Sequence, residues 1–482
     1  MKVLLCSFHS SPYPRGRHFG FPRNPLVGLG YIASSLQQDD HEVRIVDDYV
    51  LSPAAIREEI RRFRPDVVGV EVFTASFRVC SEWAQDIRRE CPGARVVFGG
   101  PHPTTLPEVT AKVPAVDAIV LGEGEATMRR LLAAWGAGRE PDGIPGLRYR
   151  SADGSIVDNG PPEPIEDLDA LPCPAFDLMN LDAYLSSGTQ RATGSRCTTA
   201  ITSRGCRYRC AFCGQPFGHR VRLRSPENVV SELEILIRDH DVHEVVYVDD
   251  DFATDPGRAA AICDLIVDRG IRVTWHVHCR VDTVSRALMQ RMADAGCRSV
   301  FFGVESGSQK MLDAMNKRTT VERIEAAVRD AKETIGWVAC GFVFGMPGET
   351  RETAEETIRF AKRLDPAIAN FLFAIPMPGS PLYEQSVADG LIDPAALDWD
   401  QFDMSPKGHK VPVAAFGELS ENELLRLVKR AHREFFFRLR PMLRILRRLG
   451  TPWGLRLLWL GVREVMVQQL AHRRGVPSRA QV

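Results

Sequence analysis

The chain has 482 residues, too many for one hydrophobic core of ordinary size, so two or three domains are expected. Lysine plus arginine (61) nearly equals aspartate plus glutamate (62), so no overall charge favours nucleic acid as a partner. No apolar run approaches the roughly 20 residues of a membrane span, and the apolar start Val3–Cys6 is too short for a secretion signal. Twelve cysteines, mostly in apolar contexts, fit a reducing compartment, and we expect a cytoplasmic protein.

Residues 1–136 alternate short β-branched runs with helical stretches such as Ser76 to Glu90. This alternation predicts a parallel sheet with helices on both faces, which is a complete doubly wound α/β domain. The expected strands are Lys2–Cys6, Glu42–Val46, Asp66–Val72, Arg95–Phe98 and Asp117–Leu121.

Prolines interrupt residues 137–195 so often that long helices and central strands are disfavoured there. We interpret this segment as a linker with a small hairpin around Leu147–Val157.

From residue 196 to 395 strands and helices alternate again, with a repeat of about 40 residues. Ser225 and Asp255 are expected to cap helices that begin with proline, and another helix is expected over Thr320–Thr334. Right-handed crossovers would curl six such units into a partial (β/α)6 barrel, whose ligand site lies at the carboxyl ends of the strands. The expected strands are Thr198–Ser203, Glu244–Val248, Arg272–His278, Ser299–Val304, Val338–Phe344 and Ala369–Ala374.

Three cysteines follow the first barrel strand with the spacing C-x3-C-x2-C: Cys206, Cys210 and Cys213. Three soft thiolates suit three irons of a cubane cluster and leave the fourth iron without a protein ligand. Structural zinc requires a fourth ligand, for which His219 and Cys197 are the nearest candidates. A redox dithiol would leave Cys206 without a role.

This loop, with Phe212 directly before the third cysteine, resembles the signature of the radical S-adenosylmethionine (SAM) enzymes. The resemblance implies that the three cysteines hold a 4Fe–4S cluster, that SAM chelates the open iron, and that Phe212 lies beside the adenine. It also implies SAM contacts at the other strand ends. The residues concerned are Asp250, Arg280, Glu305, Gly341 and Gly345.

Two of these strand ends also allow plainer interpretations. The carboxylates of Asp249, Asp250 and Asp251 repel one another and need a cation, a hydroxyl-rich ligand or an arginine, although a solvated turn would also accommodate them. His276 and His278 share a strand face but have no third metal ligand in view, which favours substrate contact or packing.

In the first domain, Gly28 to Ala33 has the form G-x-G-x-x-A, but about 20 residues separate it from the first strand, so a nicotinamide site is disfavoured. The domain instead resembles the Rossmann-like cobalamin-binding domain that precedes the barrel in one class of radical SAM enzymes. The chain lacks the D-x-H-x-x-G motif of many such domains, since residues 47–52 read DDYVLS. The residues that this resemblance places at the cofactor are Ser76, Gly99, Gly100, Gly122 and Glu123.

Residues 396–482 are expected to form a mostly helical third segment. A helix from Glu421 to about Leu449 would carry nine lysines or arginines and the aromatic run Phe435 to Phe437. Such a helix either covers the barrel with a solvated basic side or makes peripheral contact with an anionic membrane.

The resemblance implies a cobalamin-dependent enzyme in which a flavodoxin- or ferredoxin-type donor reduces the cluster and SAM cleavage yields a radical. That radical takes hydrogen from an unactivated carbon, to which cobalamin then supplies a methyl group. The alternatives are a radical enzyme that rearranges, cyclises or deoxygenates its substrate, and a non-catalytic iron–sulfur or zinc scaffold. The substrate is expected to be a small molecule or a lipid, and no nucleic acid partner is expected.

Overall fold

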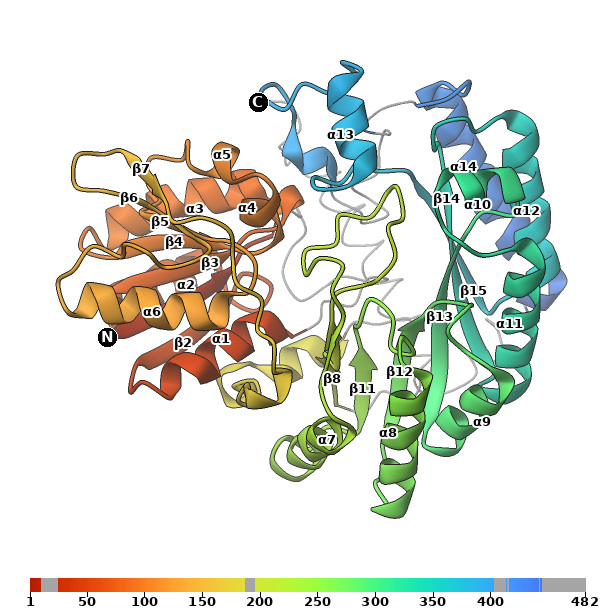
Figure 1. Cartoon of the computed structure of the whole chain (residues 1–482), viewed down its shortest axis with the longest axis horizontal. Coiled ribbons are helices and arrows are strands. Elements are labelled where there is room, and N and C mark those ends of the chain that lie inside the picture. Colours follow the sequence, from red (N-terminus) through yellow and green to blue (C-terminus); the bar gives the residue numbers. More distant parts are fainter. Residues whose placement is uncertain (10–24, 187–195, 403–412, 414–415, 442, 444–482) are drawn as a thin grey trace, which may run out of the picture.

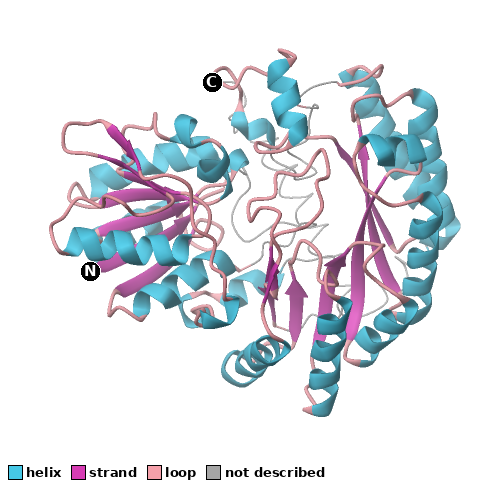
Figure 2. Ribbon diagram, viewed as in Figure 1, coloured by secondary structure: helices cyan, strands magenta, loops and turns pink. Residues whose placement is uncertain are grey.

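The described part of the protein contains two large sheets, one mainly and one wholly parallel, which are covered by helices, joined by an irregular segment and followed by further helices (Figures 1 and 2). The computed structural model describes residues 1–9, 25–186, 196–402, 413, 416–441 and 443. Among these residues, no helix is both long and apolar enough to cross a bilayer.

The first sheet has the strand order β2-β1-β3-β4-β5-β6-β7, and its first five strands are parallel. The five expected strands are confirmed. The order reverses direction between β1 and β3, which is where doubly wound domains bind their ligands. The strands are β1 Lys2–Ser7, β2 Glu42–Asp47, β3 Val67–Glu71, β4 Arg95–Gly99, β5 Ala118–Val120, β6 Leu147–Arg150 and β7 Ile156–Asp158. The helices are α1 Val27–Gln37, α2 Pro53–Phe63, α3 Phe77–Glu90, α4 Pro101–Thr105, α5 Pro107–Thr110 and α6 Gly124–Gly136.

The expected hairpin around residues 147–157 is present as β6 and β7. It does not stand alone in the linker, because β6 pairs antiparallel with β5 and extends the first sheet. Sequence alternation could not reveal this pairing, since the partner strand is set by tertiary contacts.

The second sheet is a six-stranded, open parallel sheet with the order β15-β14-β13-β12-β11-β8, which confirms the partial barrel (Figure 1). Its strands are β8 Cys197–Ala200, β11 Glu244–Tyr247, β12 Thr274–Cys279, β13 Cys297–Glu305, β14 Trp337–Phe344 and β15 Ile368–Phe373. The helices of this part are α7 Pro226–His240, α8 Pro256–Asp268, α9 Arg286–Asp294, α10 Gln309–Ala314, α11 Val321–Thr334, α12 Arg351–Leu364 and α13 Pro381–Ala388.

The expected caps of the barrel helices are confirmed. Ser225 accepts a hydrogen bond from the N–H of Asn228 at the start of α7, and Asp255 and Thr320 cap α8 and α11 in the same way. These helices therefore start where local sequence alone predicts.

The irregular segment before the barrel contributes short 3₁₀ turns and packs against both sheets. Phe176, Met179 and Leu181 belong to the same hydrophobic core as the barrel helices and Tyr31 of α1. The 3₁₀ turns of the chain are η1 Thr74–Ser76, η2 Leu168–Ala170, η3 Phe176–Leu178, η4 Leu181–Ser186 and η5 Trp399–Phe402.

The basic helix α14 spans Glu421–Phe436 and covers β15 and α12. Leu424, Leu427 and Phe435 are buried in the barrel core, and Arg430 and Glu434 pair with Glu355 and Lys362 of α12. In this range the helix is thus a cap on the barrel. The expected continuous helix to about Leu449 is not found, because α14 ends at Phe436 and the chain turns at Phe437. Residues 442 and 444–449 lie outside the described residues.

Candidate metal centre and adjoining cofactor site

The three cysteines lie on a loop, residues 205–221, that is closed at its base by a short hairpin. Its strands β9 (Ser203–Arg204) and β10 (Arg222–Leu223) pair antiparallel. Gly205 starts the loop with a φ of 86°, and a β-carbon there would collide with the carbonyl oxygen of Arg220. The loop therefore needs glycine at this position.

The tip of the loop is attached to the barrel through its backbone. The N–H of Ala211 donates to the carbonyl of Met315 at 2.9 Å, and the carbonyl of Ala211 accepts from the N–H of Leu382 at 2.9 Å. Phe212 packs against an apolar cluster that includes Met315 and Met346. These contacts hold the three cysteines at the carboxyl ends of the barrel strands.

The three cysteine sulfurs do not lie close enough together to surround a single ion. Four sulfurs around one zinc ion lie about 3.8 Å apart. Within the described residues, only His9, Asp47 and Asp48 form a group of three whose ligand atoms all lie within 4.8 Å of one another, so the cysteine sulfurs are spaced more widely.

Neither candidate for a fourth zinc ligand has such a role in the structure. Cys197 begins β8, at the amino end of the strand and away from the loop. His219 is exposed, and its Nδ1 contacts the carbonyl of Tyr208 at 3.1 Å. The zinc interpretation therefore lacks its fourth ligand.

The electrostatics of the loop require a cation when the sulfurs are ionised. Burial raises the pKa of Cys213 to about 11 and also raises the pKa of Cys206, and the negative charge of Asp250 acts in the same direction on both. A positively charged metal bound to the sulfurs would stabilise their thiolate form. The donor set thus fits an iron–sulfur cluster.

The three carboxylates after β11 differ in their surroundings. Asp249 accepts hydrogen bonds from Thr202 and Ser203, and Asp251 accepts from the N–H of Arg280 and the hydroxyl of Thr283. Both are buried, whereas Asp250 between them is exposed. Asp250 is therefore the carboxylate of the three that is free to meet a ligand.

Arg280, which is expected to bind a SAM carboxylate, also braces the cysteine loop. Its guanidinium lies 3.5 Å from the ring centroid of Tyr208, donates to the carbonyl of Lys317 at 2.6 Å and pairs with Asp282 at 3.1 Å. One of its nitrogens lies 3.8 Å from Sγ of Cys210. These contacts use most of the N–H donors of the Arg280 guanidinium.

Glu305 closes β13 in a strained conformation, with a φ of 66°. Its carboxylate is buried and pairs with Nζ of Lys317 at 2.7 Å. Backbone strain of this kind concentrates at functional sites. Sequence reasoning missed Lys317, which has no motif around it and reaches the site only through the fold.

Gly341 in β14 and Gly345 directly after it allow close packing within the protein itself. A β-carbon at Gly341 would lie 2.9 Å from the ring of Phe301, and Gly345, with a φ of 89°, would bring one within 3.1 Å of Leu424. The N–H of Gly345 also donates to buried Glu349. No SAM contact is needed to explain either glycine.

The first-domain residues gather at the carboxyl edge of the first sheet. Gly99 ends β4, and Gly100 has no room for a side chain beside the backbone of Val72. A β-carbon at Gly122 would collide with the side chain of Pro162. The hydroxyl of Ser76, at the end of η1, accepts a hydrogen bond from the N–H of Phe73 at 3.2 Å. The carboxylate of the fifth residue, Glu123, is occupied by Arg204, Arg222 and the N–H of Ile165.

The carboxyl ends of both sheets meet at the cysteine loop (Figure 1). A β-carbon at Gly379, after β15, would collide with Thr105 of α4 at 2.8 Å and would lie 3.4 Å from the carbonyl oxygen of Gly214. A cofactor on the first sheet would therefore lie next to the cysteine loop.

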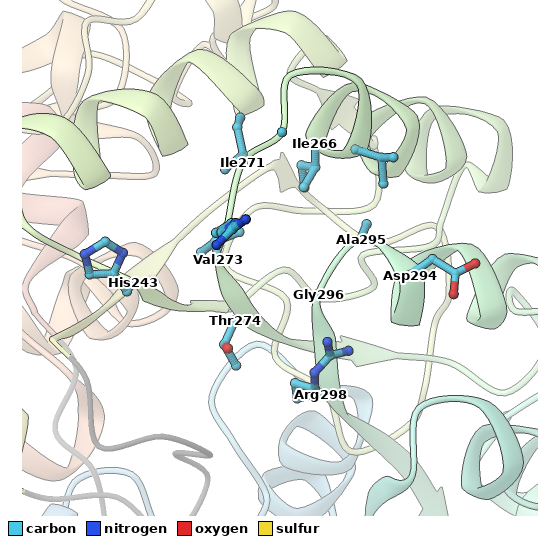
Figure 3. Close-up of a pocket in the computed structure, with 12 residues that line it drawn as sticks. His243, Ile266, Ile271, Val273, Thr274, Asp294, Ala295, Gly296 and Arg298 are labelled. Atoms are coloured by element: carbon cyan, nitrogen blue, oxygen red, sulfur yellow. The ribbon is translucent and has the colours of Figure 1, made fainter.

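Three other features do not join this site. His276 is buried between Glu244 (2.8 Å) and Ser299 (2.7 Å), and the ring of His278 packs against that of Phe301 at a tilt of 50°. A hollow of about 520 Å³ lies at the amino ends of β11, β12 and β13, the end of the barrel away from the cysteines (Figure 3).

Comparison with known families gives two matches. Residues 200–361 match the radical SAM superfamily, and residues 23–132 match the B12-binding domain. The first match covers the cysteine loop and four of the six barrel strands, β11 to β14, and the second covers the first domain from α1 into α6.

Two relatives are similar over most of their length. An uncharacterized methyltransferase of Pyrococcus horikoshii is 35% identical over 421 residues, covering 86% of this chain and 88% of the relative. The anaerobic magnesium-protoporphyrin IX monomethyl ester cyclase of Rubrivivax gelatinosus is 30% identical, covering 86% and 74%.

Among solved structures, the radical SAM methyltransferase TsrM from Kitasatospora setae has the same fold, with a TM-score of 0.68 and 24% identity over 80% of this chain and 76% of TsrM. A second TsrM structure holds cobalamin and a 4Fe–4S cluster.

Proposed function

The chain belongs to the radical SAM superfamily, in the branch that carries a B12-binding domain, and on this premise we propose that it methylates an unactivated carbon of a small-molecule or lipid substrate. Its cofactors are SAM, a 4Fe–4S cluster and cobalamin. The observation that supports the proposal most is the meeting of both carboxyl edges at the cysteine loop, because methyl transfer requires the two cofactors to share one substrate.

Each part of the site has a role in this proposal. Cys206, Cys210 and Cys213 hold the cluster, Glu305 and Asp250 offer carboxylates to SAM or the substrate, and Phe212 forms an apolar wall. The cluster with SAM supplies radical chemistry, and cobalamin supplies a transferable methyl group. The chain orients these groups and excludes water from them. The reducing electron comes from a flavodoxin- or ferredoxin-type donor.

Anaerobic incubation with methyl-labelled SAM, cobalamin, a reductant and a solvent extract of the producing cells tests the proposal. We expect label in a product that is heavier than its precursor by one methylene group. Label recovered only in methionine would contradict methyl transfer.

A second candidate is a radical reaction without methylation. The similarity to the Rubrivivax cyclase supports it, since that relative is 30% identical over most of its length. In that case the product mass would be unchanged or lower, and the same incubation separates the two candidates.

A further inference from the structure

The base of the cysteine loop is fixed to the first domain by a buried group of four charged residues, which we call the carboxylate clamp: Glu123, Glu125, Arg204 and Arg222. Arg204 donates to Glu123 at 2.8 Å and to Glu125 at 2.6 Å, and Arg222 donates to Glu123 at 2.6 Å. Both arginines lie on the β9–β10 hairpin, directly opposite each other. Both glutamates come from the first domain, next to β5.

The clamp is balanced in charge and closed to solvent. Its two arginines and two glutamates are each at most 6% exposed. Buried ion pairs add little stability compared with apolar packing, but they tolerate only one arrangement, since an unpaired buried charge is costly. The clamp therefore specifies where the hairpin lies relative to the first domain.

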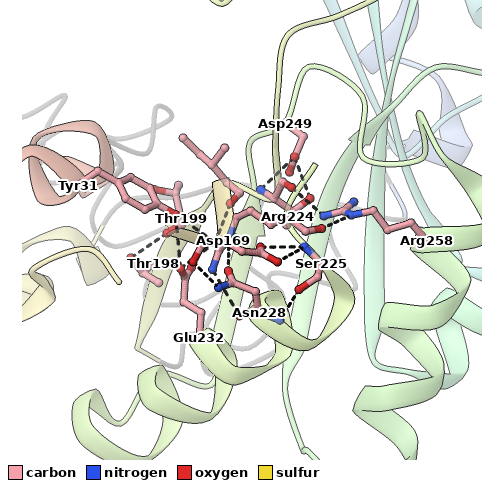
Figure 4. A network of polar contacts seen from close by, with 12 residues as sticks. Tyr31, Asp169, Thr198, Thr199, Arg224, Ser225, Asn228, Glu232, Asp249 and Arg258 are labelled. Carbon is pink, nitrogen blue, oxygen red and sulfur yellow. Dashed lines mark hydrogen bonds and ion pairs between the residues drawn. The ribbon is translucent and has the colours of Figure 1, made fainter. Parts of the chain in front are cut away.

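A second polar network fixes the same hairpin from the side of α7 (Figure 4). Arg224, just after β10, donates to the hydroxyl of Tyr31 in α1 at 3.0 Å and pairs with Glu232 of α7 at 2.8 Å. Arg258 of α8 donates to the carbonyls of Thr202 and Arg224. Both ends of the hairpin are thus tied down.

The loop is consequently held at two places: its tip by the barrel and its base by the first domain. A small change at the base would tilt the three cysteines relative to the strand ends where Asp250 and Glu305 lie. Outer contacts that orient metal ligands commonly alter affinity or activity when they are removed.

We propose that Glu123 and Glu125 are positioning residues through which the first domain sets the cluster in register with the SAM site. The inference rests on the proposed role of the three cysteines as cluster ligands. Glu123 touches both arginines and Glu125 only one, so Glu123 should have the larger effect.

The test is a SAM titration of the reduced cluster, followed by electron paramagnetic resonance, in the full chain reconstituted anaerobically with iron and sulfide. The variants are E123Q and E125Q, with R204K as a second way to loosen the clamp, because lysine keeps the charge but lacks the rigid planar donors of the guanidinium. The control is E166Q, since Glu166 pairs with Arg220 of the same loop, but both side chains are more than half exposed.

We expect E123Q to retain its iron but to need about tenfold more SAM for half of the spectral change. E125Q and R204K should show smaller increases, and E166Q should match the unaltered chain. The inference would be overturned if E125Q and R204K fold and need the same SAM concentration as the unaltered chain for half of the spectral change. This holds even if E123Q fails to fold. An unaltered chain that shows no SAM-dependent change would overturn the proposed function and the inference with it.

Discussion

Replacing Cys210 with alanine is expected to remove most of the iron from the anaerobically purified protein and to abolish SAM cleavage. Cys210 is 7% exposed, and its sulfur is the one beside the guanidinium of Arg280. Loss of an outer contact to a metal ligand alone costs about 10–100-fold in affinity or activity, so loss of a ligand should cost at least about 100-fold. Iron analysis and the rate of methionine release measure both effects.

Two matched variants distinguish a cluster from zinc. C197A and H219A remove the nearest candidates for a fourth protein ligand, and both should retain iron and cleave SAM at the unaltered rate. Metal lost from either variant, or a colourless protein that contains zinc, would contradict the cluster assignment.

Changing Gly205 to alanine should prevent cluster assembly although every cysteine is intact. The residue has a φ of 86°, and a β-carbon would collide with the carbonyl of Arg220, which closes the loop. Unfavourable backbone conformation alone costs about 1–3 kcal/mol, and the collision adds to it. We expect iron content to fall at least as far as in a single cysteine variant, with the barrel still folded by circular dichroism.

Gly218 provides the control in the same loop. Its φ is 72°, but nothing lies within 4 Å of where a β-carbon would be. G218A therefore tests the backbone cost without the collision, and it should retain most of its iron. Equal iron loss in G205A and G218A would show that general loop strain, and not closure at Gly205, controls assembly.

Much of the fold could be predicted because its signals are local. Alternating β-branched runs predict parallel strands, and an N-cap residue followed by proline fixed the starts of α7 and α8. The C-x3-C-x2-C spacing likewise lies within one loop, so the three cysteines could be recognised together.

The remaining parts depend on contacts between distant segments. The pairing of β6 with β5, the Glu305–Lys317 pair and the carboxylate clamp join residues that no short motif connects. The role of a glycine is difficult to predict from the sequence. A β-carbon at Gly100, Gly122 or Gly341 would crowd neighbouring parts of the chain, whether or not a cofactor binds nearby. A positive φ, a tight contact within the protein and a bound ligand all require glycine, so the sequence alone does not distinguish them.

The most direct test of this account is the cofactor content of the full chain purified without oxygen from cells supplied with cobalamin. We expect about four iron atoms and one cobalamin per chain, with the absorption of both cofactors in one spectrum. Protein that carries the cluster but no cobalamin, even after reconstitution with an excess of it, would contradict a shared site at the two carboxyl edges.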